Sequence, residues 1–229
     1  MGRGLARDPE GLPRQRRGVV PGGRGRFPDY DVLANAGHWD AVTREVVLAR
    51  LAPPPIRFFD AAQARTLGAF CDTVTAQDAE PRIPVVAYVD QKLHEHRRDG
   101  YRYDDMPDDD EVWRLVARGL DEAARALGRQ SFDALDLDER HDVCERFADG
   151  DLSGGAWEDL NVSRAWTLVM RGVLQAFYSH PWAWNEIGFG GPAYPRGYAA
   201  LGVGHREHWE PDEAFELDPV KDTAERDLE

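Results

Sequence analysis

The residues best suited to chemistry lie near the end of the chain, where His180 and Glu186 are six positions apart. A histidine and a carboxylate can act together as a general base pair. Tyr194 and Arg196 follow in the same segment and would complete a pocket. No Gly-x-Ser-x-Gly nucleophile motif accompanies them. We therefore favour a structural role, in which His180 caps the last turn of the preceding helix. The alternative is a stand-alone helical enzyme that uses these four residues.

Metal and nucleotide motifs are weak in this sequence. His94 and His96 are two residues apart, so they point to different sides of a helix. Cys71 and Cys144 do not form a Cys-x-x-Cys pair. The segment Gly188-Phe-Gly-Gly-Pro-Ala193 has the spacing of a dinucleotide fingerprint, but no strand pattern precedes it and its proline opposes a helix. We expect no catalytic residue set, no metal and no cofactor in this chain.

The segment from Tyr178 to Tyr198 is rich in aromatic residues, glycine and proline and carries almost no charge. It shows neither helical nor strand periodicity, so we expect an ordered, irregular loop. Such loops pack either on their own domain or on another protein. Because large aromatic residues and arginine anchor many interfaces, we predict a partner interface here, with closure of the chain's own core as the alternative. The predicted interface residues are His180, Trp182, Trp184, Asn185, Phe189, Tyr194, Arg196 and Tyr198.

Helical periodicity divides the middle of the chain into six predicted helices. The first is expected over residues 38–51, with one apolar stripe that faces the core. The second follows Asp60, which is a favourable N-cap residue. The third begins after Pro84 and ends in the charged run 94–98. The stripe of the first helix consists of Val42, Val46, Val47 and Leu51.

The other three helices are longer or more clearly capped. The fourth follows the acidic run at residues 104–111, since negative charge favours a helix N-terminus, and ends near Gly128. The fifth lies between Asp136 and Gly150, and the sixth covers residues 162–177. No alternating strand pattern or hairpin motif occurs. The sequence therefore predicts an all-α fold, with a single helical domain of about six helices.

Composition restricts the classes of partner. The chain of 229 residues is long enough to bury a core, and its net charge of -14 argues against nucleic acid. No apolar run approaches the roughly 20 residues of a membrane span, so we expect no membrane insertion. The twin arginine Arg16-Arg17 is not followed by an apolar stretch. We therefore expect no signal peptide and a cytoplasmic protein, and the arginine-rich composition favours a bacterial source.

Both ends of the chain differ in composition from its middle. Residues 1–26 are rich in arginine, glycine and proline, and residues 206–229 are strongly acidic. Neither segment contains enough apolar surface to offset the entropy of ordering. We expect two disordered tails on either side of a helical domain over residues 27–205.

The loop from Tyr178 to Tyr198 resembles the C-terminal signature of the gluconate 2-dehydrogenase subunit 3 family. The resemblance extends back through residues 164–177 and through a helix pair over residues 58–93, with Pro-Arg-Ile-Pro84 between its helices. In all it covers roughly residues 27–205. Exported members carry a twin-arginine signal, and this sequence departs from them there, which leaves export only as part of a complex.

The resemblance implies a non-catalytic small subunit that binds and stabilises a large flavoprotein of the glucose-methanol-choline type. The large subunit would carry FAD and oxidise a sugar, a sugar acid or a polyol. A cytochrome subunit is a further candidate component of the complex. A general helical chaperone or adaptor remains a third reading beside the accessory subunit and the stand-alone enzyme.

Overall fold

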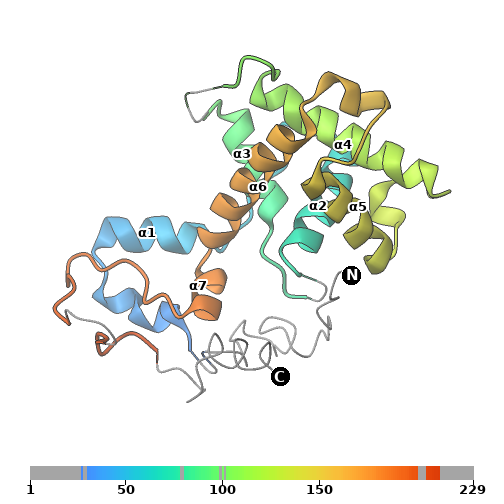
Figure 1. The fold of residues 1–229 in the computed structure, drawn as a ribbon. Helices are drawn as coiled ribbons and strands as arrows, with labels where there is room; N and C mark the ends of the chain where they lie inside the picture. Colours follow the sequence, from blue (N-terminus) through green and yellow to red (C-terminus); the bar gives the residue numbers. More distant parts are fainter. Residues whose placement is uncertain are drawn as a thin grey trace. The chain divides into compact units, whose positions relative to one another are not determined.

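The computed structural model describes most of the chain between residues 27 and 211. The described residues are 27, 30–77, 80–97, 100, 102–200 and 205–211. Within them the fold is all-α, as the sequence predicts, with seven α-helices, three short 3-10 helices and no strand (Figure 1). The tail predicted over residues 1–26 lies outside this part, as do residues 212–229 of the predicted acidic tail.

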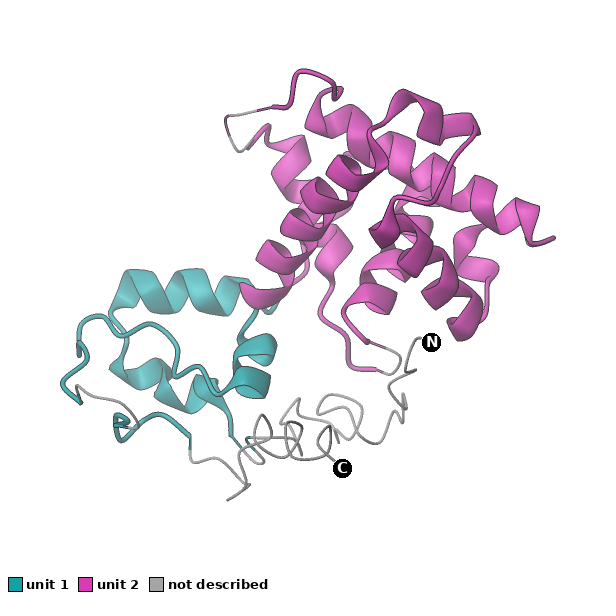
Figure 2. Cartoon of the chain, viewed as in Figure 1, with its two compact units in different colours: residues 1–51, 180–229 teal, residues 52–179 magenta. Residues whose placement is uncertain are grey.

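The chain divides into two compact units (Figure 2). Residues 52–179 form unit 2, and residues 1–51 together with residues 180–229 form unit 1. The domain predicted over residues 27–205 therefore contains parts of both, and its boundaries stay a prediction.

Unit 2 contains the second to sixth predicted helices, all close to their expected positions. Its central helix α2 packs on α3, α4 and α5, while α6 also packs on α3, α4 and α5. Two short 3-10 helices, η4 and η5, both contact α4. The elements are α2 (Ala61–Val74), α3 (Val85–His94), α4 (Asp109–Ala126), η4 (Phe132–Ala134), α5 (Leu137–Asp149), η5 (Gly155–Asp159) and α6 (Val162–Tyr178).

Local capping explains why these helices begin and end where they do. Asp60 and Asp136 each form a capping box, in which the aspartate accepts the N–H of the third helical residue and that residue's side chain accepts the aspartate's N–H. Gly150 ends α5 with a φ of 79°, in the left-handed region that glycine adopts without steric cost. These three residues are the ones that the sequence predicted.

The core of unit 2 is built around an aromatic cluster. The ring of Phe147 is fully buried, and its centroid lies 4.9 Å from that of Trp157, 5.2 Å from that of Trp166 and 6.0 Å from that of Phe70. Gly119 on α4 allows Trp157 to approach, since a Cβ there would lie 2.4 Å from the indole. The cluster joins α2, α5, α6 and η5 into one packed core.

A buried carboxylate fastens the segment before α2 to α3. Asp90 is fully buried and accepts the backbone N–H groups of Arg57, Phe58 and Phe59 at 2.8–2.9 Å. A carboxylate placed in this way satisfies three donors that secondary structure leaves unpaired. The irregular residues 57–59 therefore have a fixed position in unit 2.

Unit 1 is smaller, and its helices are short. It contains η3 (Val32–His38), α1 (Ala41–Ala49) and α7 (Pro181–Ile187), and η3 packs on α7. Its hydrophobic cluster consists of Val32, Trp39, Val47 and Trp184. Phe27 and Val32, which precede α1 in the chain, are both buried.

The apolar stripe predicted for the first helix is not its core face. Val47 is buried, but Val42 is 72% exposed and Val46 is 49% exposed. Helical periodicity shows which side chains share a face, whereas the neighbouring elements decide which face is covered. In unit 1 the buried contact of α1 is made through Val47 alone.

Candidate functional site

The sequence predicted an irregular loop for the whole aromatic segment, and this is wrong for part of it. Residues 181–187 form the helix α7, which begins after His180 and ends at Gly188. Proline at the first helical position is favoured, because its missing N–H would have no partner there. Gly188 has a φ of 68° and provides a left-handed C-cap. A helix of seven residues, with two tryptophans and a proline, is too short for a periodicity signal, which explains the error.

His180 caps a different helix end from the one expected. It is the N-cap of α7, and its Nδ1 accepts the backbone N–H of Trp182 at 3.2 Å. Burial, and next the positive charge of Arg50, lower the pKa of His180 to about 4. A backbone hydrogen bond with Arg50 opposes this shift. His180 is therefore a neutral acceptor at a helix N-terminus rather than a cation at a C-terminus.

Trp184 and Asn185 face the interior of unit 1. Trp184 belongs to the hydrophobic cluster, and Asn185 is 1% exposed. The Oδ1 of Asn185 accepts the backbone N–H of Val32 at 2.8 Å, which ties α7 to the start of η3. Of the eight predicted interface residues, His180, Trp184 and Asn185 thus have a structural role in closing unit 1.

Two glycines allow the segment after α7 to lie close to the rest of unit 1. A Cβ at Gly188 would lie 2.4 Å from the ring of Phe27, and one at Gly191 would lie 2.8 Å from the indole of Trp39. Both glycines also have a positive φ. This part of the aromatic segment therefore packs on the unit's own residues.

The segment then folds against residues 207–210, which the sequence assigned to the acidic tail. The guanidinium of Arg196 lies 4.0 Å from the ring centroid of Trp209, and the Tyr198 ring lies 6.1 Å from it. Glu207 accepts the backbone N–H groups of Ala199 and Ala200, the latter at 2.6 Å. These contacts join residues 196–200 to residues 207–209.

Tyr30 is hydrogen-bonded both to Trp209 and to Asn35. Its hydroxyl donates to the carbonyl of Trp209 at 3.3 Å and accepts from the side-chain amide of Asn35. Burial raises the pKa of Tyr30 to about 12. The phenol therefore stays protonated and acts as a fixed hydrogen-bond group.

The remaining predicted interface residues are more accessible. Tyr194 is 68% exposed, Tyr198 is 49% exposed and Phe189 is 39% exposed, while Trp182 and Arg196 are partly buried. The exposed valines of α1 add to this apolar surface of unit 1, and the sequence analysis missed them because it placed them in the core. Val42 and Val46 are four residues apart, which places them on one face of the helix. That spacing does not show whether the face is buried or exposed.

The residues that a stand-alone enzyme would use lie in different environments. The Nδ1 lone pair of His180, which a general base would need, already accepts a hydrogen bond. Tyr194 is largely exposed, and Arg196 is stacked on Trp209. This arrangement fits structural roles for His180 and Arg196 better than a shared catalytic pocket.

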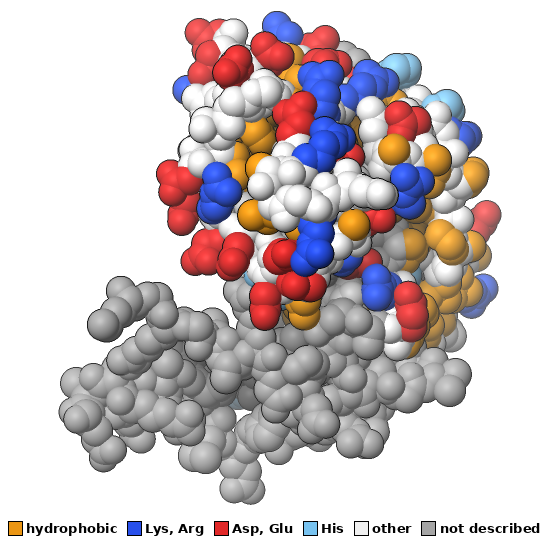
Figure 3. Space-filling model, turned by 90° about the vertical axis from the view of Figure 1, so that its right-hand side faces the viewer, with side chains coloured by type: hydrophobic (Ala, Val, Ile, Leu, Met, Phe, Trp, Pro, Cys, Tyr) orange, Lys and Arg blue, Asp and Glu red, His pale blue; other side chains and the backbone are white. Residues whose placement is uncertain are grey.

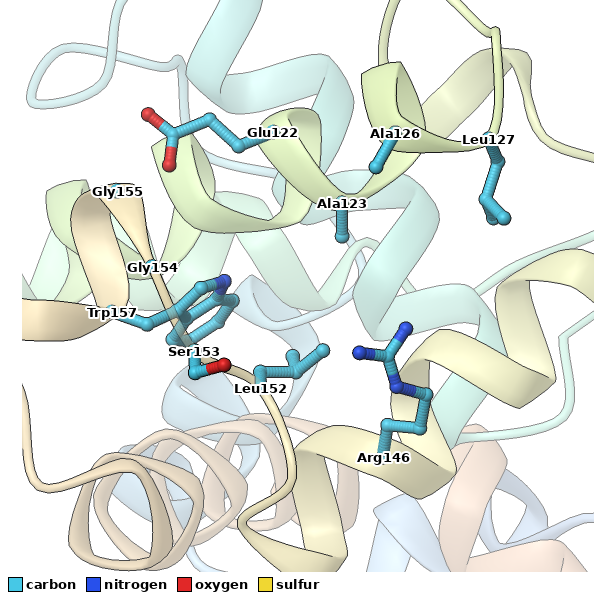
Figure 4. Close-up of a pocket in the computed structure, with 10 residues that line it drawn as sticks. All are labelled: Glu122, Ala123, Ala126, Leu127, Arg146, Leu152, Ser153, Gly154, Gly155 and Trp157. Atoms are coloured by element: carbon cyan, nitrogen blue, oxygen red, sulfur yellow. The ribbon is translucent and has the colours of Figure 1, made fainter.

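Unit 2 has a surface groove that the sequence analysis did not find. It lies between α4, the end of α5 and the loop that leads into η5, and its volume is about 430 Å³ (Figure 4). The lining residues are Glu122, Ala123, Ala126, Leu127, Arg146, Leu152, Ser153, Gly154, Gly155 and Trp157.

The described part of the chain shows no metal site and no membrane span. No group of three or more His, Cys, Asp or Glu side chains there has the arrangement of a metal site. Cys71 and Cys144 are both buried and unbridged, and burial is the main factor that raises the pKa of Cys71. None of the described helices combines the length and apolar character that a bilayer span requires.

Comparison with known proteins identifies the family. No curated protein and no solved structure matches the chain. A family model does match: the model described as gluconate 2-dehydrogenase subunit 3 aligns with residues 61–191. The match begins with α2 and continues through α7 to Gly191, so it includes the helices of unit 2 and part of the aromatic segment. Because it covers more than half of the 229 residues, the chain belongs to the gluconate 2-dehydrogenase subunit 3 family.

Proposed function

We propose that this chain is a non-catalytic accessory subunit that binds and stabilises a large FAD-dependent sugar or polyol oxidoreductase of the glucose-methanol-choline type. FAD is bound by the large subunit in this proposal, and a cytochrome subunit is a further candidate component. Family membership supports a role as one subunit of a dehydrogenase.

One observation carries the proposal: the large apolar side chains that unit 1 leaves in contact with solvent. Large apolar side chains that stay exposed are candidates for contact with another protein, and aromatic residues are enriched in interfaces. In the described part of the chain, the hydrophobic cluster of unit 1 has four buried members, fewer than the large apolar side chains that the unit leaves exposed. They are Val42, Val46, Leu48, Ile187, Phe189, Tyr194 and Tyr198.

The interface that we propose differs in part from the one that the sequence suggests. His180, Trp184 and Asn185 position α7 from within unit 1. Phe189, Tyr194 and Tyr198 provide the contact area, together with the valines of α1. Large side chains with few rotatable bonds lose little entropy when a partner covers them, so they are good anchors.

Co-purification tests the proposal directly. The chain is expressed alone and together with a large flavoprotein of the glucose-methanol-choline type from the same genome, and any yellow complex is isolated through a tag on this chain. Tyr194→Ala and Val46→Ser should each weaken the complex by roughly 30-fold if the residue is a central anchor, since that ratio corresponds to about 2 kcal/mol. Leu137→Ser is the matched control, because Leu137 is 39% exposed and lies in unit 2.

Three results would contradict the proposal. Unchanged complex formation by both variants, with correctly folded chains, would exclude this surface. Sugar oxidation or bound flavin in the purified lone chain would favour the stand-alone enzyme. Equal capture of unrelated unfolded proteins would favour the general chaperone.

A further inference from the structure

The groove of unit 2 has an apolar lining. Leu152 and Trp157 lie at its base and are each 4% exposed, and the short side chains of Ala123 and Ala126 leave space above them (Figure 4). Leu127 is 49% exposed at one end. Small-molecule sites are usually hollows of about 300–1,000 Å³, lined mainly by apolar residues with a few polar groups. The groove has this size and this composition.

A positively charged side chain lies at one end of the groove. The guanidinium of Arg146 points from α5 into the space between Leu152 and Leu127 (Figure 4). Among the described residues, the Arg146 side chain has no hydrogen-bond acceptor, carboxylate or ring as a partner. An unpaired guanidinium over an apolar surface provides a docking point for an anion.

Most other arginines of unit 2 do have partners. Arg82 pairs with Asp72 at 2.6 Å and Arg129 pairs with Glu139 at 2.9 Å, while Arg114 lies over the ring of Phe58. On the face shown in Figure 3, acidic and basic side chains are intermixed in the same way. Arg146 shares with Arg118 and Arg125 the lack of such a partner among the described residues, and of these three only Arg146 lines the groove.

The acidic residue of the groove lies at the other end. Glu122 accepts the backbone N–H of Ala156 at 2.8 Å, and its carboxylate points away from Arg146 (Figure 4). It is held by the start of η5, since a Cβ at Gly155 would clash with it. The groove therefore has the unpaired guanidinium of Arg146 at one end. At the other end, the carboxylate of Glu122 already accepts a hydrogen bond.

We propose that this groove binds a small carboxylate with an apolar body. The carboxylate accepts hydrogen bonds from Arg146, whose planar fork suits two oxygens, and the body covers Leu152, Ala123 and Ala126. The hydroxyl of Ser153 lies beside Leu152 and is a second donor (Figure 4). The site lies within unit 2 and does not depend on the proposed partner surface of unit 1.

Binding of octanoate to the full chain tests this inference, with acetate and octanol as comparison ligands. Titration is followed by calorimetry and by chemical-shift changes at Leu152 and Trp157. Octanoate should bind saturably and more tightly than acetate, which lacks the body, or octanol, which lacks the charge. Arg146→Gln should weaken octanoate binding at least about tenfold and leave octanol binding unchanged, because only the charged hydrogen bonds are lost.

Two further variants keep the test decisive. Arg125→Gln removes the same charge from α4 at a residue that does not line the groove, so it should leave octanoate binding unchanged. Ala126→Leu fills the groove on a helical position that accepts leucine, so it should weaken both octanoate and octanol. The inference is overturned if octanoate does not saturate, if the shift changes lie elsewhere, or if Arg146→Gln and Arg125→Gln have equal effects.

Discussion

Unit 2 and unit 1 are stabilised in different ways. Unit 2 has five α-helices around a continuous aromatic core, and its helix ends are capped by local sequence signals. The described residues of unit 1 form two short α-helices and one 3-10 helix around a hydrophobic cluster of four residues. The comparison indicates that unit 2 can supply most of the folding free energy, because buried apolar area is the main favourable contribution.

Polar links and close contacts hold unit 1 together instead. Asn185 binds the backbone of Val32, Glu207 binds the backbone of Ala200, and Arg196 stacks on Trp209. Each such contact contributes on the order of 1 kcal/mol, so the loss of a few opens the structure locally. Unit 1 should therefore respond to pH and to a partner more strongly than unit 2.

The largest expected effect is on the core of unit 2. Phe147→Ala should reduce the free energy of unfolding by about 3–5 kcal/mol, because it leaves a cavity among Phe70, Trp157 and Trp166. Urea denaturation followed by circular dichroism measures this. A loss below about 1 kcal/mol would show that unit 2 does not dominate the stability of the chain.

A smaller effect is expected in unit 1 on acidification. The pKa of His180 is about 4 in the folded chain and about 6.5 when the histidine is exposed. The unfolded state therefore binds the proton first, so the stabilisation is complete above pH 6.5 and is lost as the pH falls towards 4. The loss is at most about 3 kcal/mol, since each pKa unit corresponds to 1.36 kcal/mol.

Amide hydrogen exchange across this pH range would localise the effect. Protection should fall in α7 and η3 while the helices of unit 2 stay protected. His180→Asn keeps an acceptor at the N-cap but does not titrate, so it should remove most of this pH dependence. Parallel loss of protection in both units would show that another group is responsible.

The smallest effects distinguish the two faces of α1. Val47→Ala should destabilise unit 1 by about 1–2 kcal/mol, whereas Val46→Ala should change the stability by less than about 0.5 kcal/mol. The reason is exposure, which is 2% for Val47 and 49% for Val46. Thermal denaturation of the two variants in parallel measures the difference. Equal destabilisation would mean that the outer face of α1 is also packed within the chain.

The sequence alone was sufficient to predict most of unit 2. Leu67, Phe70 and Cys71 share one face of α2, and Val143, Cys144 and Phe147 share one face of α5; all six are buried. Asp60, Asp136 and Gly150 set helix ends through contacts with residues only a few positions away. Local signals of this kind are complete in the sequence, because every participant is within one turn.

The aromatic segment shows where such reasoning fails. Its composition indicated an ordered structure but concealed α7, since the N-cap is a histidine and the helix has only two turns. Asn185 and Gly191 owe their roles to Val32 and Trp39, about 150 residues earlier in the chain. No pattern within the segment contains that pairing.

The sequence by itself determined the all-α class, the positions of the long helices, and the resemblance of the aromatic segment to a family. Only the tertiary structure decided that Val46 is exposed and Val47 buried, that His180 is a neutral cap, and that Arg146 points into a groove. The physical reason is the range of the interactions. Helix formation depends on neighbours three or four residues away, whereas burial, pKa and the shape of a surface depend on elements that come together only when the chain folds.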